Sequence, residues 1–135
     1  MVPTQIRIIY GDTDQMGVVY YANYLRFFEA GRTEFLRAKG MRYRDIEAHH
    51  RLMLPVTEAL VSYRAPARYE DLITVETSLA LIRRASARFE YRVHREGELL
   101  ATGHTTHACV DAEGRVKRMP PELVSALSSG ESPAG

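Results

Sequence analysis

The stretch Gly11–Arg37, GDTDQMGVVYYANYLRFFEAGRTEFLR, decides the fold, because it joins an acidic loop to a long amphipathic helix. The loop places two carboxylates, Asp12 and Asp14, shortly before the helix begins. A helix start exposes backbone N–H groups that no intrahelical carbonyl accepts, and it carries the positive end of the helix dipole. A carboxylate beside such donors indicates acyl-transfer chemistry, in which negative charge develops on a carbonyl oxygen.

Apolar or small residues recur at intervals of three or four between Ala22 and Gly40, which is the spacing of one helical face. The members of this face are Tyr24, Phe27, Phe28, Gly31, Phe35 and Ala38. Gly40 supplies a C-cap, so the pattern predicts a core helix of roughly 18 residues with one wet side. Gly31 has no side chain in the middle of this face, and we expect another backbone to approach it closely.

Strand patterns lie on both sides of the helix. Thr4–Tyr10 alternates with period two and predicts a strand, whereas Tyr43–His50 predicts a short helical segment. The chain then alternates as far as Val110, most clearly over Ala85–His94. The apolar face of that strand consists of Ala85, Ala87, Phe89, Tyr91 and Val93.

Turn signals divide the alternating region into about four antiparallel strands. They lie at Ala65-Pro66, Glu96-Gly97-Glu98 and Asp111-Ala112-Glu113-Gly114. One strand, one long helix and a run of strands predict an α+β domain in which an antiparallel sheet covers the helix. Because a single helix covers only one face of a sheet, we expect the other face or an edge to meet a second subunit.

The chain length and composition predict one domain over residues 1–127. A chain of 135 residues fits a single compact core. Pro120-Pro121 precedes a last short helical segment, Glu122–Leu127. The small and polar residues 128–135, SSGESPAG, predict a disordered tail.

The charge balance gives no reason to expect nucleic acid as a partner, since 18 Lys and Arg face 17 Asp and Glu. Cys109 is the single cysteine, which excludes an internal disulfide, and its strand context predicts a small buried hydrophobe. The chain has no secretory h-region and no apolar run long enough to span a bilayer. We therefore expect a cytoplasmic protein without integral membrane contact.

No metal site is predicted. A calcium-binding loop counted from Asp12 puts Met16 at an oxygen-ligand position and Asn23 where a bidentate glutamate belongs. His104 and His107 are three residues apart on a strand, so they point to opposite faces and cannot readily hold one ion. Each is expected to be a hydrogen-bonded strand histidine.

The chain resembles the hotdog-fold acyl-CoA thioesterases, in particular the 4-hydroxybenzoyl-CoA thioesterase branch. That branch includes the short-chain acyl-CoA thioesterases encoded beside the bacterial Tol–Pal envelope system. The residues that carry the resemblance are Asp12 to Asp14, Gly17 to Tyr21, Asn23-Tyr24 and the helix to Arg37. It implies an antiparallel sheet wrapped around one long central helix, and self-association as a homotetramer or homodimer. It also implies hydrolysis of a short-chain or aromatic acyl-CoA without a cofactor, since coenzyme A is part of the substrate.

The resemblance also implies roles for individual residues. Asp14 matches the catalytic carboxylate of the family, whereas Asp12 does not inherit that role and is expected to shape the loop. The backbone N–H of Tyr21 matches the group that polarises the thioester carbonyl. Some Tol–Pal-associated members carry a catalytic histidine at this position, and this chain has tyrosine there. Gly17 and Val18 are expected to contact the substrate.

Two basic pairs are expected to bind the coenzyme A nucleotide. Arg83-Arg84 matches a pair that relatives use on the protein surface, often from a neighbouring subunit, and Lys117-Arg118 is a second candidate. Guanidinium groups suit phosphate oxygens because their N–H donors form a planar fork. The same pairs have a plainer explanation as solvated charges at strand ends.

Several alternatives stay open at the level of sequence. Asp14 acts either as a nucleophile or as a general base toward water. Glu29 either meets a polar acyl tail or pairs with Arg26 or Arg32 on the same helix. A hotdog dehydratase or hydratase is an alternative enzyme, although no histidine lies between Met1 and Ala48. A non-catalytic acyl-CoA-binding or interaction module is the alternative from another class.

Overall fold

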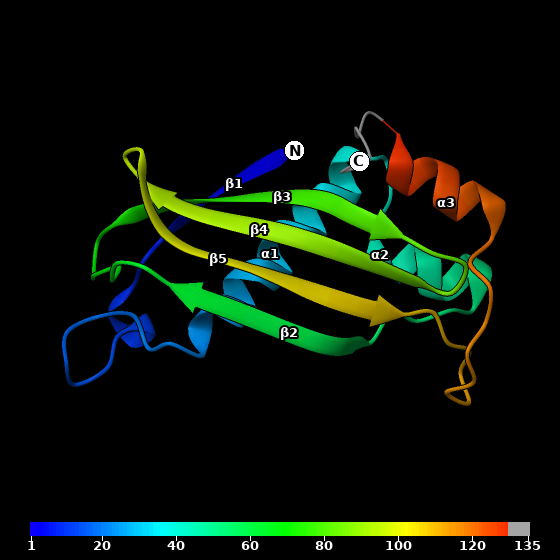
Figure 1. Ribbon diagram of the computed structural model, residues 1–135, viewed down its shortest axis with the longest axis horizontal. Coiled ribbons are helices and arrows are strands. Elements are labelled where there is room, and N and C mark those ends of the chain that lie inside the picture. The colour runs from blue at the N-terminus through cyan, green and yellow to red at the C-terminus, as the bar shows by residue number, and fades with distance from the viewer. Residues whose placement is uncertain (130–135) are drawn as a thin grey trace.

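The computed structural model describes residues 1–129, which form a five-stranded antiparallel sheet with one long helix lying across a face of it (Figure 1). The strands are β1 (Val2–Arg7), β2 (Val56–Tyr63), β3 (Leu72–Ile82), β4 (Ser86–Arg95) and β5 (Glu98–Ala108). The helices are α1 (Asn23–Ala38), α2 (Tyr43–Asp45) and α3 (Pro121–Ser128), with a 3-10 turn η1 (Tyr10–Asp12) and a π turn η2 (Ile46–His50). The strand order is β1-β3-β4-β5-β2, so β1 and β2 are the two edges.

The predicted α+β architecture is confirmed, but the first strand ends earlier than the alternation suggested. β1 stops at Arg7, and Tyr10 lies in η1 with 77% of its surface exposed. The cause is the Asp12 carboxylate, whose Oδ2 accepts the Ile9 N–H at 2.9 Å and turns the chain away from the sheet. A local side-chain bond of this kind competes with the strand ladder.

The helix ends differ from the prediction by one or two residues. α1 begins at Asn23, and Gly40 follows it at φ 78°, a conformation that glycine adopts without strain. Ala38 is exposed and does not belong to the buried face. α3 continues through Ser128, into the segment predicted as a tail. Residues 130–135 of that predicted tail lie outside the described residues.

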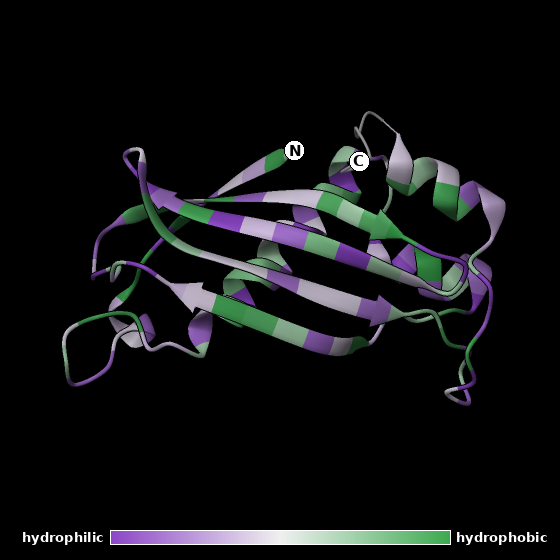
Figure 2. Cartoon of the chain, in the orientation of Figure 1, coloured by the Kyte–Doolittle hydropathy of each residue, from purple (hydrophilic) through white to green (hydrophobic). Residues whose placement is uncertain are grey.

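The core lies between α1 and the inner face of the sheet. Phe28 stacks on Tyr91 with the ring centroids 4.2 Å apart, and Phe35 meets Phe89 edge-on at 5.5 Å. Figure 2 shows hydrophobic and hydrophilic residues alternating along the strands, as a sheet with one buried face requires. The predicted apolar face of β4 is buried at Ala87, Phe89, Tyr91 and Val93, whereas Ala85 precedes the strand and is half-buried.

The glycine in the middle of α1 allows the helix to lie close to the sheet. A Cβ on Gly31 would be 2.5 Å from Thr77 Oγ1 and 3.0 Å from Val75 Cγ1. The close neighbours are therefore side chains of β3, and the expected backbone contact was wrong. A Cβ on Gly103 of β5 would collide with the Phe28 ring and the Leu60 carbonyl.

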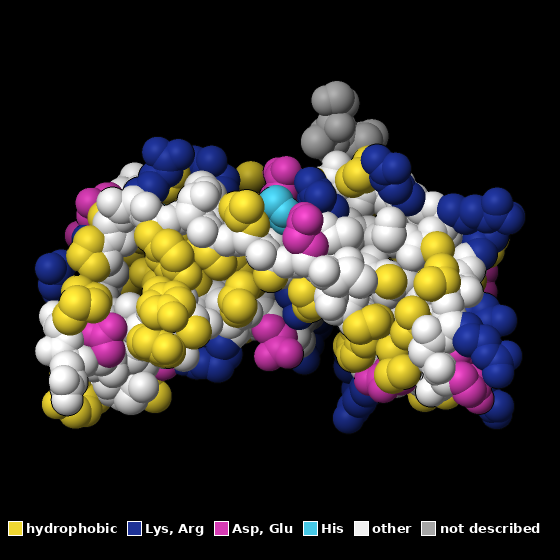
Figure 3. Space-filling view, turned by 60° about the horizontal axis from the view of Figure 1, so that its bottom comes forward, with side chains coloured by type: hydrophobic (Ala, Val, Ile, Leu, Met, Phe, Trp, Pro, Cys, Tyr) yellow, Lys and Arg dark blue, Asp and Glu magenta, His cyan; other side chains and the backbone are white. Residues whose placement is uncertain are grey.

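Edge strand β2 is exposed along nearly its whole length. Its apolar side chains Val56, Leu60 and Tyr63 are each 49% exposed. Figure 3 turns this side of the molecule toward the viewer and shows hydrophobic side chains gathered on it. An unpaired edge with exposed apolar side chains is a template for pairing with another strand.

Within residues 1–129, no helix is both long enough and apolar enough to cross a membrane.

Candidate active site

The acidic loop folds into a small hairpin that ends at the start of α1. Thr13 and Val19 form an isolated bridge, and the Asp14 N–H donates to the Val18 carbonyl at 2.9 Å. The Gly17 N–H donates back to the Asp14 carbonyl at 2.9 Å, with Gly17 at φ 80°. The hairpin thus fixes the position of Asp14. It also explains why residue 17 is a glycine, because other residues are strained at that φ.

The Asp14 side chain is half-buried and faces a cavity of about 290 Å³. Its Oδ1 accepts the Met16 N–H at 2.9 Å, whereas Oδ2 accepts no hydrogen bond from the described residues. The cavity is lined by Asp14, Met16, Val18, Val19, Tyr21, Tyr24, Tyr63, Arg64, Ala65 and Pro66. Asp14 therefore presents one carboxylate oxygen to a largely apolar cavity.

Tyr21 lines the same cavity, two residues before α1 begins. The next turns are closed by hydrogen bonds from Asn23 N–H to the Tyr20 carbonyl and from Leu25 N–H to the Ala22 carbonyl. No carbonyl or side chain among residues 1–129 accepts the Tyr21 N–H. The positive end of α1 therefore offers an open donor at this position.

Asp12, in contrast, is only 4% exposed and is used within the loop. Its carboxylate accepts the Ile9 N–H and pairs with Arg26 of α1. Its carbonyl accepts the Asn23 side-chain amide and the Tyr20 N–H, each at 2.9 Å. These contacts tie the loop to the helix start, in agreement with the structural role predicted for Asp12.

Of the residues expected to contact substrate near Asp14, the structure brings Val18 and Tyr21 to the cavity but not Gly17. Gly17 serves the turn instead. Tyr63 of β2 was missed by sequence reasoning, and its Oη donates to the Tyr21 carbonyl at 2.8 Å. The Ala65-Pro66 turn marks the end of this strand in the sequence, but no local signal shows that the strand end borders the site.

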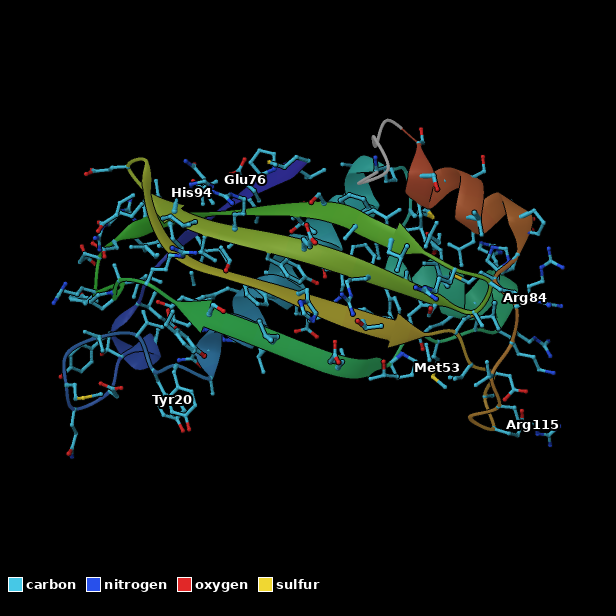
Figure 4. The ribbon with its side chains drawn as sticks, viewed as in Figure 1. Tyr20, Met53, Glu76, Arg84, His94 and Arg115 are labelled. Atoms are coloured by element: carbon cyan, nitrogen blue, oxygen red, sulfur yellow. The ribbon has the colours of Figure 1, made fainter. Side chains whose placement is uncertain are left out.

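The basic residues separate into two environments. Arg83, Arg84 and Arg118 line one hollow of about 700 Å³ beside α3. Lys117 is outside that lining and lies 3.8 Å from the Asp111 carboxylate. Figure 4 shows Arg84 and Tyr20, which belongs to the Asp14 loop, at opposite ends of the molecule. One chain therefore cannot place these arginines beside its own Asp14.

Glu29 lies in a third cavity, of about 260 Å³, between α1 and the beginning of β2. The lining residues are Glu29, Arg32, Thr33, Leu36, Tyr43, Leu54, Pro55, Val56, Phe89 and His107. Glu29 is exposed and forms no ion pair with any described residue, although Arg26 and Arg32 are near it on the helix. Glu29 does not line the Asp14 cavity of its own chain.

The two strand histidines point to opposite faces, as predicted. His104 Nε2 lies 2.9 Å from Glu58 Oε1 on the outer face, whereas His107 is buried and bonded to the Leu54 carbonyl and Thr105. In the part of the chain that the structure describes, no cluster of His, Cys, Asp and Glu is able to hold a metal ion. Burial raises the pKa of the Cys109 thiol, which disfavours a nucleophilic role.

An antiparallel sheet wrapped around one central helix, with a carboxylate turn at the helix start, defines the hotdog class of thioester hydrolases. The chain belongs to the thioesterase-like superfamily, whose family model matches residues 10–127. The resemblance read from the loop and helix motif is confirmed.

Known proteins of this family are similar over most of their length. The acyl-CoA thioesterase YbgC of Haemophilus influenzae is 37% identical over 112 residues, which cover 83% of this chain and 82% of the relative. A structure of a hypothetical protein from Thermus thermophilus is 41% identical, with a TM-score of 0.88 and coverage of 93% and 96%. A 4-hydroxybenzoyl-CoA thioesterase mutant in complex with 4-hydroxybenzoyl-CoA shares the fold at 23% identity, with a TM-score of 0.87 and coverage of 94% and 98%.

The buried His107 predicts a stability loss at mildly acidic pH. Burial lowers the pKa of His107 to about 4, whereas an unfolded histidine titrates near its usual value of about 6.5. Between these values the unfolded chain binds the extra proton, so the free energy of unfolding should fall as pH drops from about 6.5 toward 4. Urea unfolding at pH about 7.5 and about 5 measures this fall.

The matched variants are His107→Gln and His49→Gln, the second of which changes an exposed histidine. His107→Gln should show a smaller loss between the two pH values, whereas His49→Gln should keep the wild-type difference. An unchanged pH dependence in His107→Gln would contradict the assignment.

Proposed function

We propose that this chain hydrolyses an acyl-CoA thioester to the free acid and coenzyme A, with Asp14 as the catalytic carboxylate and the Tyr21 N–H as the oxyanion donor. The observation that carries the proposal is that Asp14 and Tyr21 line one cavity. Neither Asp14 Oδ2 nor the Tyr21 N–H is used by another described residue. The name of the Haemophilus influenzae relative supports acyl-CoA as the substrate class.

The chemistry follows either of two routes from the same geometry. Asp14 attacks the thioester carbonyl carbon and expels the coenzyme A thiolate, leaving an anhydride that water hydrolyses. Alternatively, Asp14 accepts a proton from water as the water attacks that carbon. Both routes put negative charge on the carbonyl oxygen, where the Tyr21 N–H stabilises it. Neither route needs a metal or a redox cofactor.

The dehydratase alternative has less support. It requires a histidine beside the acid, and no histidine lines the Asp14 cavity in the described part of the chain. A carboxylate and a backbone donor are sufficient for hydrolysis but do not provide the acid and base pair that dehydration needs.

We further propose that the working unit contains two chains joined along β2. Two copies related by a two-fold axis would pair this edge antiparallel, which buries the exposed Val56, Leu60 and Tyr63. Tyr63 at the end of one β2 then meets Val56 at the beginning of the other. The Asp14 cavity of one chain is thereby set against the Glu29 cavity of its partner, and a homotetramer would consist of two such pairs.

The hollow formed by Arg83, Arg84 and Arg118 is the proposed contact for the coenzyme A phosphates. Three guanidinium groups around one hollow suit phosphate oxygens. Because this hollow lies far from Asp14 in the same chain, the arginines would serve a substrate held at the partner's Asp14. Lys117, which lies near Asp111, is assigned at most a long-range electrostatic contribution.

Substituting Asp14 tests the reaction and the residue together. Asp14→Asn removes the charge with little change in shape, so thiol release from acyl-CoA should fall about a hundredfold or more. A thiol-release assay over short, long and aromatic acyl-CoAs measures this loss. Glu90→Gln, which neutralises an exposed carboxylate of β4, is the matched control and should keep wild-type turnover. Hydrolysis by Asp14→Asn near the wild-type rate would exclude the assignment.

Substituting Arg84 tests the coenzyme A contact. Arg84→Ala should raise KM for an acyl-CoA about tenfold with little change in kcat, because the nucleotide is bound equally in the ground and transition states. The same acyl group on N-acetylcysteamine, which lacks the nucleotide, should show no such change. Arg115→Ala removes an exposed arginine of the last hairpin and serves as the control. Equal effects on both thioesters would refute the contact.

Substituting Leu60 tests the paired edge. Leu60→Lys places a charge on an exposed position of β2, so the chain should fold but remain monomeric and lose thiol release. Sedimentation velocity measures the assembly, and circular dichroism checks the fold. Leu81→Lys changes a similarly exposed apolar residue of β3 and should leave the assembly intact. Full activity in a monomeric Leu60→Lys variant would contradict the two-chain site.

A further inference from the structure

A chain of buried hydrogen bonds runs from β5 to α1 beneath the Glu29 cavity. His107 Nδ1 is 2.8 Å from the Leu54 carbonyl, and His107 Nε2 is 2.8 Å from Thr105 Oγ1. Thr105 Oγ1 lies 2.6 Å from Tyr91 Oη, which accepts a hydrogen bond from Arg32 Nη1 at 2.9 Å. Thr105, His107 and Tyr91 are all buried. The Arg32 guanidinium is therefore hydrogen-bonded to a side chain of the buried core.

The donor and the acceptor of every bond in this network are determined by the groups at its two ends, the Leu54 carbonyl and the Arg32 guanidinium. A carbonyl only accepts, so His107 donates from Nδ1, and with a pKa of about 4 its Nε2 accepts at neutral pH. Thr105 then donates to His107, and Tyr91 donates to Thr105. Arginine only donates, and the Tyr91 oxygen has a free lone pair to accept from it. Each buried side chain in this hydrogen-bond network thus has its partners, and the network holds Arg32 in one orientation.

The held guanidinium has no counter-ion among the residues that the structure describes. Arg32 is half-buried in the cavity wall, and within residues 1–129 no carboxylate pairs with it. Tyr91 accepts from Nη1 only, which leaves further N–H donors. A positive charge removed from water is costly unless an anion accompanies it. The geometry therefore favours a negatively charged group as the occupant.

The remainder of the cavity selects for a short apolar body. Its walls include Leu36, Leu54, Val56 and Phe89, and its volume is about 260 Å³. Pockets for small ligands usually begin at about 300 Å³, so a long chain does not fit. The occupant that suits both features is a carboxylate at the end of a short carbon chain.

We propose that this cavity receives the far end of the acyl group and that the preferred substrate is a short acyl-CoA whose acyl group carries a second carboxylate. Arg32 binds that carboxylate and determines specificity, and Tyr91 is its positioning residue. The inference rests on the proposed function and on the paired β2 edges, which bring the partner's Asp14 to this cavity.

Glu29 provides an internal test, because its carboxylate lines the same cavity. Glu29 is exposed and lies one helical turn before Arg32, so its charge opposes the entry of a second carboxylate. Removing the charge of Glu29 should therefore increase the preference for an acyl group with a second carboxylate. Removing the charge of Arg32 should abolish that preference. If Glu29 instead bound a hydroxyl group of the substrate, removing its charge would weaken substrate binding.

The experiment compares glutaryl-CoA with 5-methylhexanoyl-CoA, which has an isosteric but uncharged acyl end. Wild type should prefer glutaryl-CoA in kcat/KM. Arg32→Gln should lower kcat/KM for glutaryl-CoA by about 10- to 100-fold and change the neutral substrate little. Glu29→Gln should raise the preference. Tyr91→Phe, which keeps the ring that stacks on Phe28, should reduce the preference without abolishing it.

A binding measurement separates this inference from the proposed function. Isothermal titration with free glutarate, on wild type, Asp14→Asn and Arg32→Gln, needs no turnover. Glutarate binding that requires Arg32 but not Asp14 supports the cavity even if no thioester is hydrolysed. Asp14-dependent hydrolysis of the neutral substrate, without glutarate binding or glutaryl preference, overturns the inference and leaves the proposed function standing. Dimer dissociation by both Glu29→Gln and Arg32→Gln, with unchanged preference, would show that Arg32 pairs with the partner's Glu29 and would overturn the inference too.

Discussion

The close contact between α1 and the inner face of the sheet is the constraint on which the rest of the structure depends. It requires that two positions carry no side chain, Gly31 on the helix and Gly103 on β5. At Gly31 even a methyl group would meet Thr77 Oγ1 at 2.5 Å. The large aromatic residues beside these glycines then fill the space, and Phe28 stacks on Tyr91. With one helix on one face, the β2 edge stays exposed.

The site follows from how the loop is attached to that helix. Asp12 is buried and binds Arg26 and Asn23 of α1, so the hairpin that bears Asp14 cannot move independently of the helix start. Two carboxylates two residues apart thereby have different environments, one neutralised inside the loop and the other facing a cavity. The exposed β2 edge places the rest of the proposed site in a second chain, because the arginine hollow and the Glu29 cavity lie away from Asp14.

The buried polar groups beneath the Glu29 cavity are arranged so that the cost of burying them is offset by specific hydrogen-bond partners. The chain from His107 to Arg32 satisfies each member and ends in a charge at a cavity wall. Such a network restricts the core to one packing arrangement and fixes the guanidinium in space. The lowered pKa of His107 is a consequence of its burial, whereas the orientation of Arg32 follows from its hydrogen bond to Tyr91.

The sequence by itself determined the helix, the strands of the alternating region, the family and the different roles expected of Asp12 and Asp14. These features depend on periodicity and turn chemistry over a few neighbouring residues, which a single sequence records. Only the tertiary structure decided that Tyr63 borders the Asp14 cavity, that Arg118 joins Arg83 and Arg84, and that Glu29 lies elsewhere. The strand order β1-β3-β4-β5-β2 sets those neighbours, and no local pattern encodes which distant segments it brings together.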